Sequence, residues 1–267
     1  MDWIEALILG LVQGLTEFFP VSSSGHLEIG KHLLGIDTPD SLRFTVVVHG
    51  ATVLSTLVVF RRDIVALISG LFRFQWNEET RYVARILWSM LPIAIVGIFF
   101  KDHVEEVFNS QNVLLLVGLM LLVTATLLAF SYYKKAGQRD ISFKDALVIG
   151  IAQTFAVLPG ISRSGATIAT GLLLGNKRTE VARFSFLMVL IPILGENMLT
   201  ILQNDFSQTP AEGAIAPLAM LAGFVAAFIS GLLACQWMIE IVKRGKLIYF
   251  ALYCALVGGL AITGNFF

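Results

Sequence analysis

The chain has little charge for its length. Only 14% of its 267 residues are Asp, Glu, Lys or Arg, whereas 56% are hydrophobic. A soluble domain of this size needs far more charge to cover its surface, so the composition indicates a polytopic membrane protein. The net charge is zero, and nothing therefore suggests that the chain binds nucleic acid.

Cysteine is also scarce, and the amino terminus lacks the basic residues of a signal peptide. The two cysteines, Cys235 and Cys254, both lie in apolar segments. They are typical of small buried hydrophobic residues, so no disulfide framework is predicted. Asp2 and Glu5 stand where a signal peptide would be basic, so we expect the apolar start to belong to the mature protein.

Long apolar runs predict the membrane spans. Each is near the roughly 20 residues that a helix needs to cross the hydrocarbon core. They lie at about 42–60, 83–100, 112–131, 184–203, 214–238 and 247–264. Two further stretches, about 3–35 and 145–175, are interrupted at Pro20–Ser24 and Pro159–Ser164. We expect each to form a re-entrant hairpin of two short helices. The predicted fold is an all-α polytopic membrane protein with six transmembrane helices plus two re-entrant helical hairpins.

The basic residues predict the orientation. They gather between the first two spans, on both sides of the second hairpin and before the last span: Arg61, Arg62, Arg73, Arg81, Lys134, Lys135, Arg139, Lys144, Lys177, Arg178, Lys243, Arg244 and Lys246. The loops at about 36–41, 101–111 and 204–213 are acidic or nearly so. The positive-inside rule places the basic loops in the cytoplasm. The first hairpin then enters from outside, the second from the cytoplasm, and both termini lie outside.

One motif occurs twice, 140 residues apart. The pairs that match are Gly10 with Gly150, Gln13 with Gln153, Ser22 with Ser162, Ser24 with Ser164, and Gly25 with Gly165. The match extends to Arg43-Phe-Thr and Arg183-Phe-Ser. Three spans per half invert the second half relative to the first. We therefore expect one membrane domain over 1–267, with repeat one at about 1–135 and inverted repeat two at about 140–267.

The first copy of the motif carries the candidates for chemistry. Gln13 and Glu17 are four residues apart and share a helix face. A carboxylate in lipid is costly, so Glu17 is either a functional group or a helix-packing residue near the interface. Its partner could be a divalent cation, Arg163 or a proton. Pro20 and the serines that follow mark the start of a new helix, and His26 can act as a base or nucleophile.

The second copy adds an arginine to a second helix start. Helix N-termini bind anions, and the guanidinium of Arg163 can hold phosphate oxygens bidentately. If the two hairpin tips meet, hydroxyls and backbone from both copies surround one cavity. The phosphate-binding candidates are Ser22, Ser24, Gly25, Ser162, Ser164, Gly165 and Thr167. This set predicts a site for a phosphate or diphosphate carried by a lipid.

Other polar residues in apolar runs are weaker candidates. Arg43 and Arg183 lie near span ends, where snorkelling is favoured over substrate contact. His49, Glu196 and Asn197 could line the cavity or bond to neighbouring helices.

The motifs resemble those of a known family over essentially the whole chain. Gln13-x-x-x-Glu17, Pro20-Val-Ser-Ser-Ser-Gly-His26 and Pro159-Gly-Ile-Ser-Arg-Ser-Gly-Ala-Thr167 are similar to the signatures of the bacterial undecaprenyl-diphosphatase (bacitracin-resistance) family. The resemblance implies hydrolysis of undecaprenyl diphosphate to undecaprenyl phosphate and inorganic phosphate, which recycles the lipid carrier of cell-wall synthesis. It further implies a bacterial plasma membrane protein whose site opens to the outer face and which uses a divalent cation, Mg²⁺ or Ca²⁺.

The same resemblance implies roles for single residues. Ser23 matches the serine proposed as nucleophile, and His26 and Arg163 match an essential histidine and an essential arginine. Gln13 and Glu17 match the Glu/Gln-x-x-x-Glu element and are tentative metal ligands. Of the two residues found at the first position, glutamine is the uncharged one, so Gln13 supplies no charge to a metal. Ser24 stands where many members have threonine. The type-2 phosphatidic acid phosphatases share Ser-Gly-His, but no histidine follows Arg163 here.

Several alternatives stay open at this point. The nucleophile could be Ser23, His26 or water, with His26 as the expected general base if it is not the nucleophile. Many membrane transporters are also built from inverted repeats with broken helices. The alternative function is therefore a polyprenyl-phosphate transporter, alone or combined with the phosphatase. The sequence does not decide whether the chain forms a homodimer.

Overall fold

The computed structural model describes residues 1–34, 41–100, 112–135, 137–203 and 215–264, and its elements are helices. The predicted loops at about 36–41, 101–111 and 204–213 lie outside these ranges, except for Ser41. The prediction of an all-α polytopic membrane protein is confirmed.

Two antiparallel helix pairs occupy the places of the predicted hairpins. The first pair is α1 (Trp3–Phe18) and α2 (Ser23–Leu34), and the second is α9 (Phe143–Phe155) and α10 (Arg163–Leu173). Each pair begins with a capping box, in which an N-cap side chain and the side chain three residues later satisfy each other's backbone N–H groups. Asp2 and Glu5 form the first box, and Ser142 and Asp145, 140 residues further on, form the second.

Most of the predicted spans are helical along their full length. The first half contains α3 (Ser41–Val59), α4 (Arg61–Leu71), α5 (Glu78–Ser89), α6 (Leu91–Phe99) and α8 (Val113–Tyr133). The second half contains α11 (Arg178–Met188), α12 (Leu190–Gln203), α13 (Pro217–Arg244) and α14 (Ile248–Gly264). In the described residues, three helices are long and apolar enough to cross a membrane: Glu78–Phe99, Val113–Tyr133 and Pro217–Arg244. The pair α3–α4, bent by 76°, is a fourth candidate, and α14 is shorter.

Some runs depart from the prediction. The run at 184–203 is interrupted at Val189, and that at 83–100 at Met90. Pro192 and Pro92 follow these breaks, and proline removes the hydrogen bond that would continue the helix. Helix α4 was not expected, because its residues were read as part of a basic loop.

The two halves exchange contacts. Helix α1 of the first pair packs on α13, and α9 of the second pair packs on α5 and α6. Glycines allow the closest approaches. A Cβ on Gly10 would lie 2.3 Å from the carbonyl oxygen of Gly223, and one on Gly150 would lie 2.1 Å from that of Ser89. The hairpins are therefore fixed by the opposite half of the chain.

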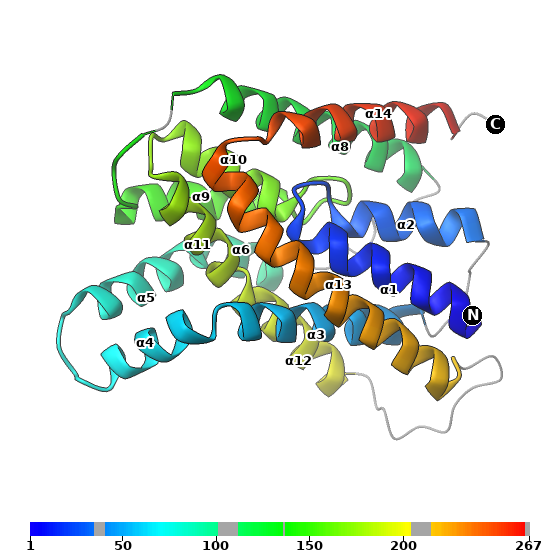
Figure 1. Ribbon diagram of the computed structural model, residues 1–267, viewed down its shortest axis with the longest axis horizontal. Coiled ribbons are helices and arrows are strands. Elements are labelled where there is room, and N and C mark those ends of the chain that lie inside the picture. Colours follow the sequence, from blue (N-terminus) through cyan, green and yellow to red (C-terminus); the bar gives the residue numbers. More distant parts are fainter. Residues whose placement is uncertain (35–40, 101–111, 136, 204–214, 265–267) are drawn as a thin grey trace.

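The arrangement brings the two pairs together from opposite ends (Figure 1). The start of α1 and the end of α14 lie at one end of the molecule, and the connection between α4 and α5 lies at the other. The pair α1–α2 extends from the first end toward the centre, and α9–α10 extends from the opposite side. Their turns meet in the middle of the molecule.

Candidate active site

The first tip, residues 19–22, contacts the second tip, residues 156–162, and the helix that follows it. Ser22 Oγ accepts a hydrogen bond from the backbone N–H of Gly160 at 3.2 Å, and Ser164 Oγ donates to the carbonyl of Phe19 at 3.3 Å. A Cβ on Gly25 would lie 3.3 Å from Gly160. Because α2 and α10 both begin here, the positive ends of two helix dipoles converge on one region.

Two helices from the ends of the halves hold the tips. Thr124 of α8 donates to the carbonyl of Gly160 and accepts from the N–H of Ser162, each at 3.1 Å. Cys254 of α14 donates to the carbonyl of Pro20 at 3.6 Å. Pro20 and Gly160 are themselves 140 residues apart, so corresponding carbonyls are held by corresponding helices.

Ser22 turns the chain into α2. Its φ of 70° lies in the left-handed region, which costs a residue with a side chain about 1–2 kcal/mol. Its hydroxyl also accepts from the N–H of Gly25 at 3.3 Å, and its carbonyl accepts from His26 Nδ1 at 2.8 Å. These contacts stabilise the turn and place Ser23 at the first position of the helix.

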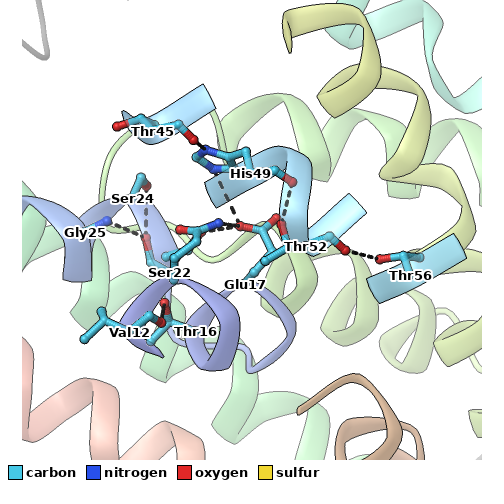
Figure 2. Close-up of polar contacts among 12 residues, drawn as sticks. Val12, Thr16, Glu17, Ser22, Ser24, Gly25, Thr45, His49, Thr52 and Thr56 are labelled. Carbon is cyan, nitrogen blue, oxygen red and sulfur yellow. Dashed lines mark hydrogen bonds and ion pairs between the residues drawn. The ribbon is translucent and has the colours of Figure 1, made fainter. Parts of the chain in front are cut away.

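The carboxylate of Glu17 is the centre of the first copy's polar contacts. Its Oε2 accepts from Ser23 Oγ at 2.7 Å and from Gln13 Nε2 at 3.0 Å. His49 Nε2, from α3, lies 3.7 Å from the same oxygen, as Figure 2 shows. The side chain of Glu17 is 7% exposed. A buried carboxylate that accepts from a serine hydroxyl can take the proton of that serine.

His26 faces away from this contact. Its Nδ1 is bound to the carbonyl of Ser22, and its Nε2 lies 2.8 Å from the hydroxyl of Tyr253 in α14. The two rings stack with centroids 5.5 Å apart. Both ring nitrogens are thus engaged, and the hydrogen-bond acceptor of Ser23 is Glu17 rather than His26.

Arg163 and Glu17 line one cavity of about 20 Å³, which has room for about one water molecule. Hydroxyls and apolar side chains line the cavity with Glu17 and Arg163: Phe18, Thr52, Thr56, Ser164, Thr167, Ser185, Phe186, Val189 and Ile193. Nη1 of Arg163 is buried and has no hydrogen-bond partner among the described residues. A buried guanidinium N–H without an acceptor is a position for an anion.

The other phosphate-binding candidates also gather at the tips. Ser162 Oγ caps α10 by accepting from the N–H of Gly165 at 3.0 Å. Ser24 Oγ lies 3.4 Å from Ser22 Oγ, and Thr167 is hydrogen-bonded to Ser185. The hydroxyls of Ser22 and Ser162 therefore already cap the starts of α2 and α10. In this structure they stabilise the turns that precede these helices.

The metal candidates supply oxygen, the ligand that Mg²⁺ and Ca²⁺ prefer. In the part of the chain that the structure describes, no three His, Cys, Asp or Glu side chains form a metal-binding group. However, Gln13 Oε1 is buried and accepts no hydrogen bond from the described residues, and it belongs to the amide that contacts Glu17. One carboxylate and one such oxygen fit a cation that takes its other ligands from phosphate and water.

The weaker candidates from the sequence lie in different surroundings. Arg183 forms an ion pair with Asp63 at 2.7 Å, lies over the ring of Tyr82 and is not among the residues that line the cavity. Arg43 is half-buried in α3. Asn197 Nδ2 would lie 3.9 Å from a Cβ on Gly50. The side chain of Glu196 lies outside the described residues.

The sequence reasoning missed some lining residues. Thr52 and Thr56 follow His49 at helical spacing, and this polar stripe in an apolar run was a usable signal. Ser185 is the last residue of the extended repeat match but was not predicted as a site residue. Tyr253 carried no signal, because it is one aromatic residue in an apolar helix.

Comparison with known proteins adds an independent finding. Residues 6–260 match the family model described as bacitracin resistance protein BacA. The chain is 60% identical to the undecaprenyl-diphosphatase of Bacteroides fragilis (strain YCH46), and the alignment covers 98% of each chain. It is 50% identical to that of Christiangramia forsetii, again over 98% of each chain. It is 38% identical to that of Korarchaeum cryptofilum over 97% of each chain.

Proposed function

Because the chain belongs to the bacitracin resistance protein BacA family, we infer that it is an undecaprenyl-diphosphatase. Such an enzyme hydrolyses undecaprenyl diphosphate to undecaprenyl phosphate and inorganic phosphate. The polytopic helical fold agrees with a substrate whose diphosphate is attached to a lipid tail. The single observation that carries the chemistry is the contact of Ser23 with Glu17 beside Arg163, whose Nη1 has no hydrogen-bond partner among the described residues.

We propose that the two helix pairs are re-entrant hairpins of an inverted-topology repeat with six transmembrane helices. The paired capping boxes, the paired glycine approaches and the meeting of the tips support this proposal. Proteins of this plan bind substrate near the membrane midplane, where broken helices meet. We further propose that the basic loops lie in the cytoplasm, as the positive-inside rule predicts, that both termini lie outside and that the site opens to the outer face.

The terminal phosphate is proposed to lie between the two hairpins. Nη1 of Arg163 supplies a fixed positive charge, and the starts of α2 and α10 add the positive ends of their dipoles. The cavity of about 20 Å³ has room for about one water molecule, so we propose that the elements that line it separate when the substrate enters. Arg163 and Glu17 come from different hairpins, so this opening also controls their distance.

In the first step, Ser23 Oγ attacks the terminal phosphorus and Glu17 takes the hydroxyl proton. The bond between that phosphorus and the bridging oxygen breaks, and its electron pair leaves with undecaprenyl phosphate. Arg163 and the helix starts stabilise the charge on the phosphoryl oxygens, which is the main requirement of phosphoryl transfer.

In the second step, water attacks the phosphorus of phosphorylated Ser23. The oxygen of Ser23 leaves and takes back its proton from Glu17. His26, three residues after Ser23 in α2 and in contact with Tyr253, takes the proton of the water. The products are inorganic phosphate and the free serine, and His26 returns its proton to solvent.

We propose that a divalent cation assists the reaction. Glu17 and Gln13 would hold it together with oxygens of the diphosphate. When bound there, it neutralises negative charge on the transferred phosphoryl group. The residues of the chain still bind, orient and deprotonate as described above.

Release of inorganic phosphate by the purified protein in detergent tests the function. Without compartments, transport cannot contribute to the signal. We expect phosphate release from undecaprenyl diphosphate, and we expect a chelator to reduce it and added Mg²⁺ or Ca²⁺ to restore it. A protein that binds the lipid but releases no phosphate under any cation condition would be a transporter, which the inverted arrangement also suits.

A further inference from the structure

Helix α14 contacts the first hairpin as well as the helix beside it. It packs along α8, and two adjacent residues reach the first hairpin. Cys254 is fully buried and donates to the carbonyl of Pro20, whereas Tyr253 is 42% exposed and meets His26. The exposed fraction of Tyr253 places its contact with His26 at the edge of the site rather than in the packed core.

The hydrogen bonds of His26 define its chemical form. A backbone carbonyl only accepts hydrogen bonds, so the contact at 2.8 Å with Ser22 requires a proton on Nδ1. In the neutral ring the lone pair is then on Nε2, and the hydroxyl of Tyr253 donates to it at 2.8 Å. The ring planes differ by 13°, so stacking and two hydrogen bonds together fix the orientation of the imidazole.

A hydroxyl suits both protonation states of the histidine. It donates to Nε2 when His26 is neutral, and it accepts from Nε2–H after His26 has taken a proton. The imidazole can therefore gain and lose a proton without turning. A phenyl ring at the same position would stack but would leave Nε2 without this partner.

We propose that Tyr253 both orients His26 and carries the proton of the attacking water to it: as its hydroxyl takes that proton, it gives its own proton to Nε2, whose one lone pair it already holds. This inference rests on the proposed function. It assigns to the carboxy-terminal helix a part in the second step that neither copy of the repeated motif contains.

Tyr253→Phe tests the proposal, because it removes the hydroxyl and keeps the ring. With undecaprenyl diphosphate as substrate, we expect kcat to fall about three- to tenfold, the effect of losing one neutral hydrogen bond, and KM to stay within about twofold. In the His26→Ala background, the same change should have no further effect. Tyr249→Phe is the matched control, since Tyr249 lies one turn earlier on α14 and is 65% exposed.

The ¹⁵N NMR signal of His26 Nε2 gives a readout that does not depend on activity. We expect it to shift in Tyr253→Phe and to stay unchanged in Tyr249→Phe. An unchanged Nε2 signal, an unchanged kcat, or an equal loss of kcat with and without His26 would each overturn the role of Tyr253. Failure of the wild-type protein to release phosphate would instead overturn the proposed function itself.

Discussion

At the scale of single residues, the carboxylate of Glu17 joins groups that are far apart in the sequence. It accepts from Ser23 and Gln13, lies near His49 of α3, and shares a cavity with Arg163. A buried carboxylate is tolerated only with such partners. The same contacts that stabilise the buried carboxylate also orient the hydroxyl of Ser23.

The guanidinium of Arg163 gives the first prediction. In Arg163→Lys the charge remains, but the planar fork that matches phosphate oxygens is lost. We expect kcat/KM for phosphate release to fall by about 100-fold or more, while Arg62→Lys, at the exposed start of α4, has no effect. Near-normal kcat/KM in Arg163→Lys would contradict bidentate binding.

The sequence predicted most of the residues that the structure brings together at the tips, but not all their contacts. Motif spacing predicted that Glu17, Ser23 and Arg163 belong to one site. It could not predict that Ser23 bonds to Glu17 while His26 turns to Tyr253, because that depends on the left-handed turn at Ser22 and on the packing of α14.

At the scale of elements, the hairpins depend on glycines where helices cross. Gly10 meets the backbone of Gly223 on α13, and Gly150 meets that of Ser89 on α5. Backbone atoms cannot move aside as a flexible side chain can. The crossing helices would have to separate to admit even one methyl group.

Substitution of these glycines gives the second prediction. We expect Gly10→Ala and Gly150→Ala each to lower the free energy of unfolding by about 1–3 kcal/mol through overpacking. Gly97→Ala is the control, because a Cβ there meets no atom within 4 Å, and alanine favours a helix over glycine. Thermal unfolding in detergent measures the three variants. An unchanged midpoint in Gly10→Ala and Gly150→Ala would argue against the close crossings.

The elements were predictable to different degrees. The breaks at Pro20–Ser24 and Pro159–Ser164 could be predicted because proline and serine end one helix and start another. The interruptions at Met90 and Val189, and the helix α4, could not, since apolar runs show where a span lies but not where it bends.

At the scale of the whole molecule, residues from both halves of the chain line one candidate site. The two hairpins extend from opposite sides of the molecule, and their tips meet in the middle. Each hairpin packs on helices from the other half of the chain. The repeated motif therefore contributes two different parts, with Glu17, Ser23 and His26 from the first copy and Arg163 from the second.

The membrane orientation gives the third prediction. An epitope added at the amino terminus should be accessible from outside in intact cells. A cysteine introduced by Lys135→Cys, at an exposed position two residues after the end of α8, should react with a membrane-impermeant thiol reagent only after permeabilisation. The buried Cys235 and Cys254 should not react. Labelling of Lys135→Cys in intact cells would contradict the proposed orientation.

The most direct test of the account is phosphate release by Ser23→Ala in detergent, measured together with binding of undecaprenyl diphosphate. The account predicts a fall in release of about 1,000-fold or more, with a Kd within about threefold of the wild-type value because Arg163 and the helix starts remain. Ser69→Ala, on the exposed face of α4, should match the wild-type protein. Release by Ser23→Ala at a rate near that of the wild-type protein would show that Ser23 is not the nucleophile and would contradict the account.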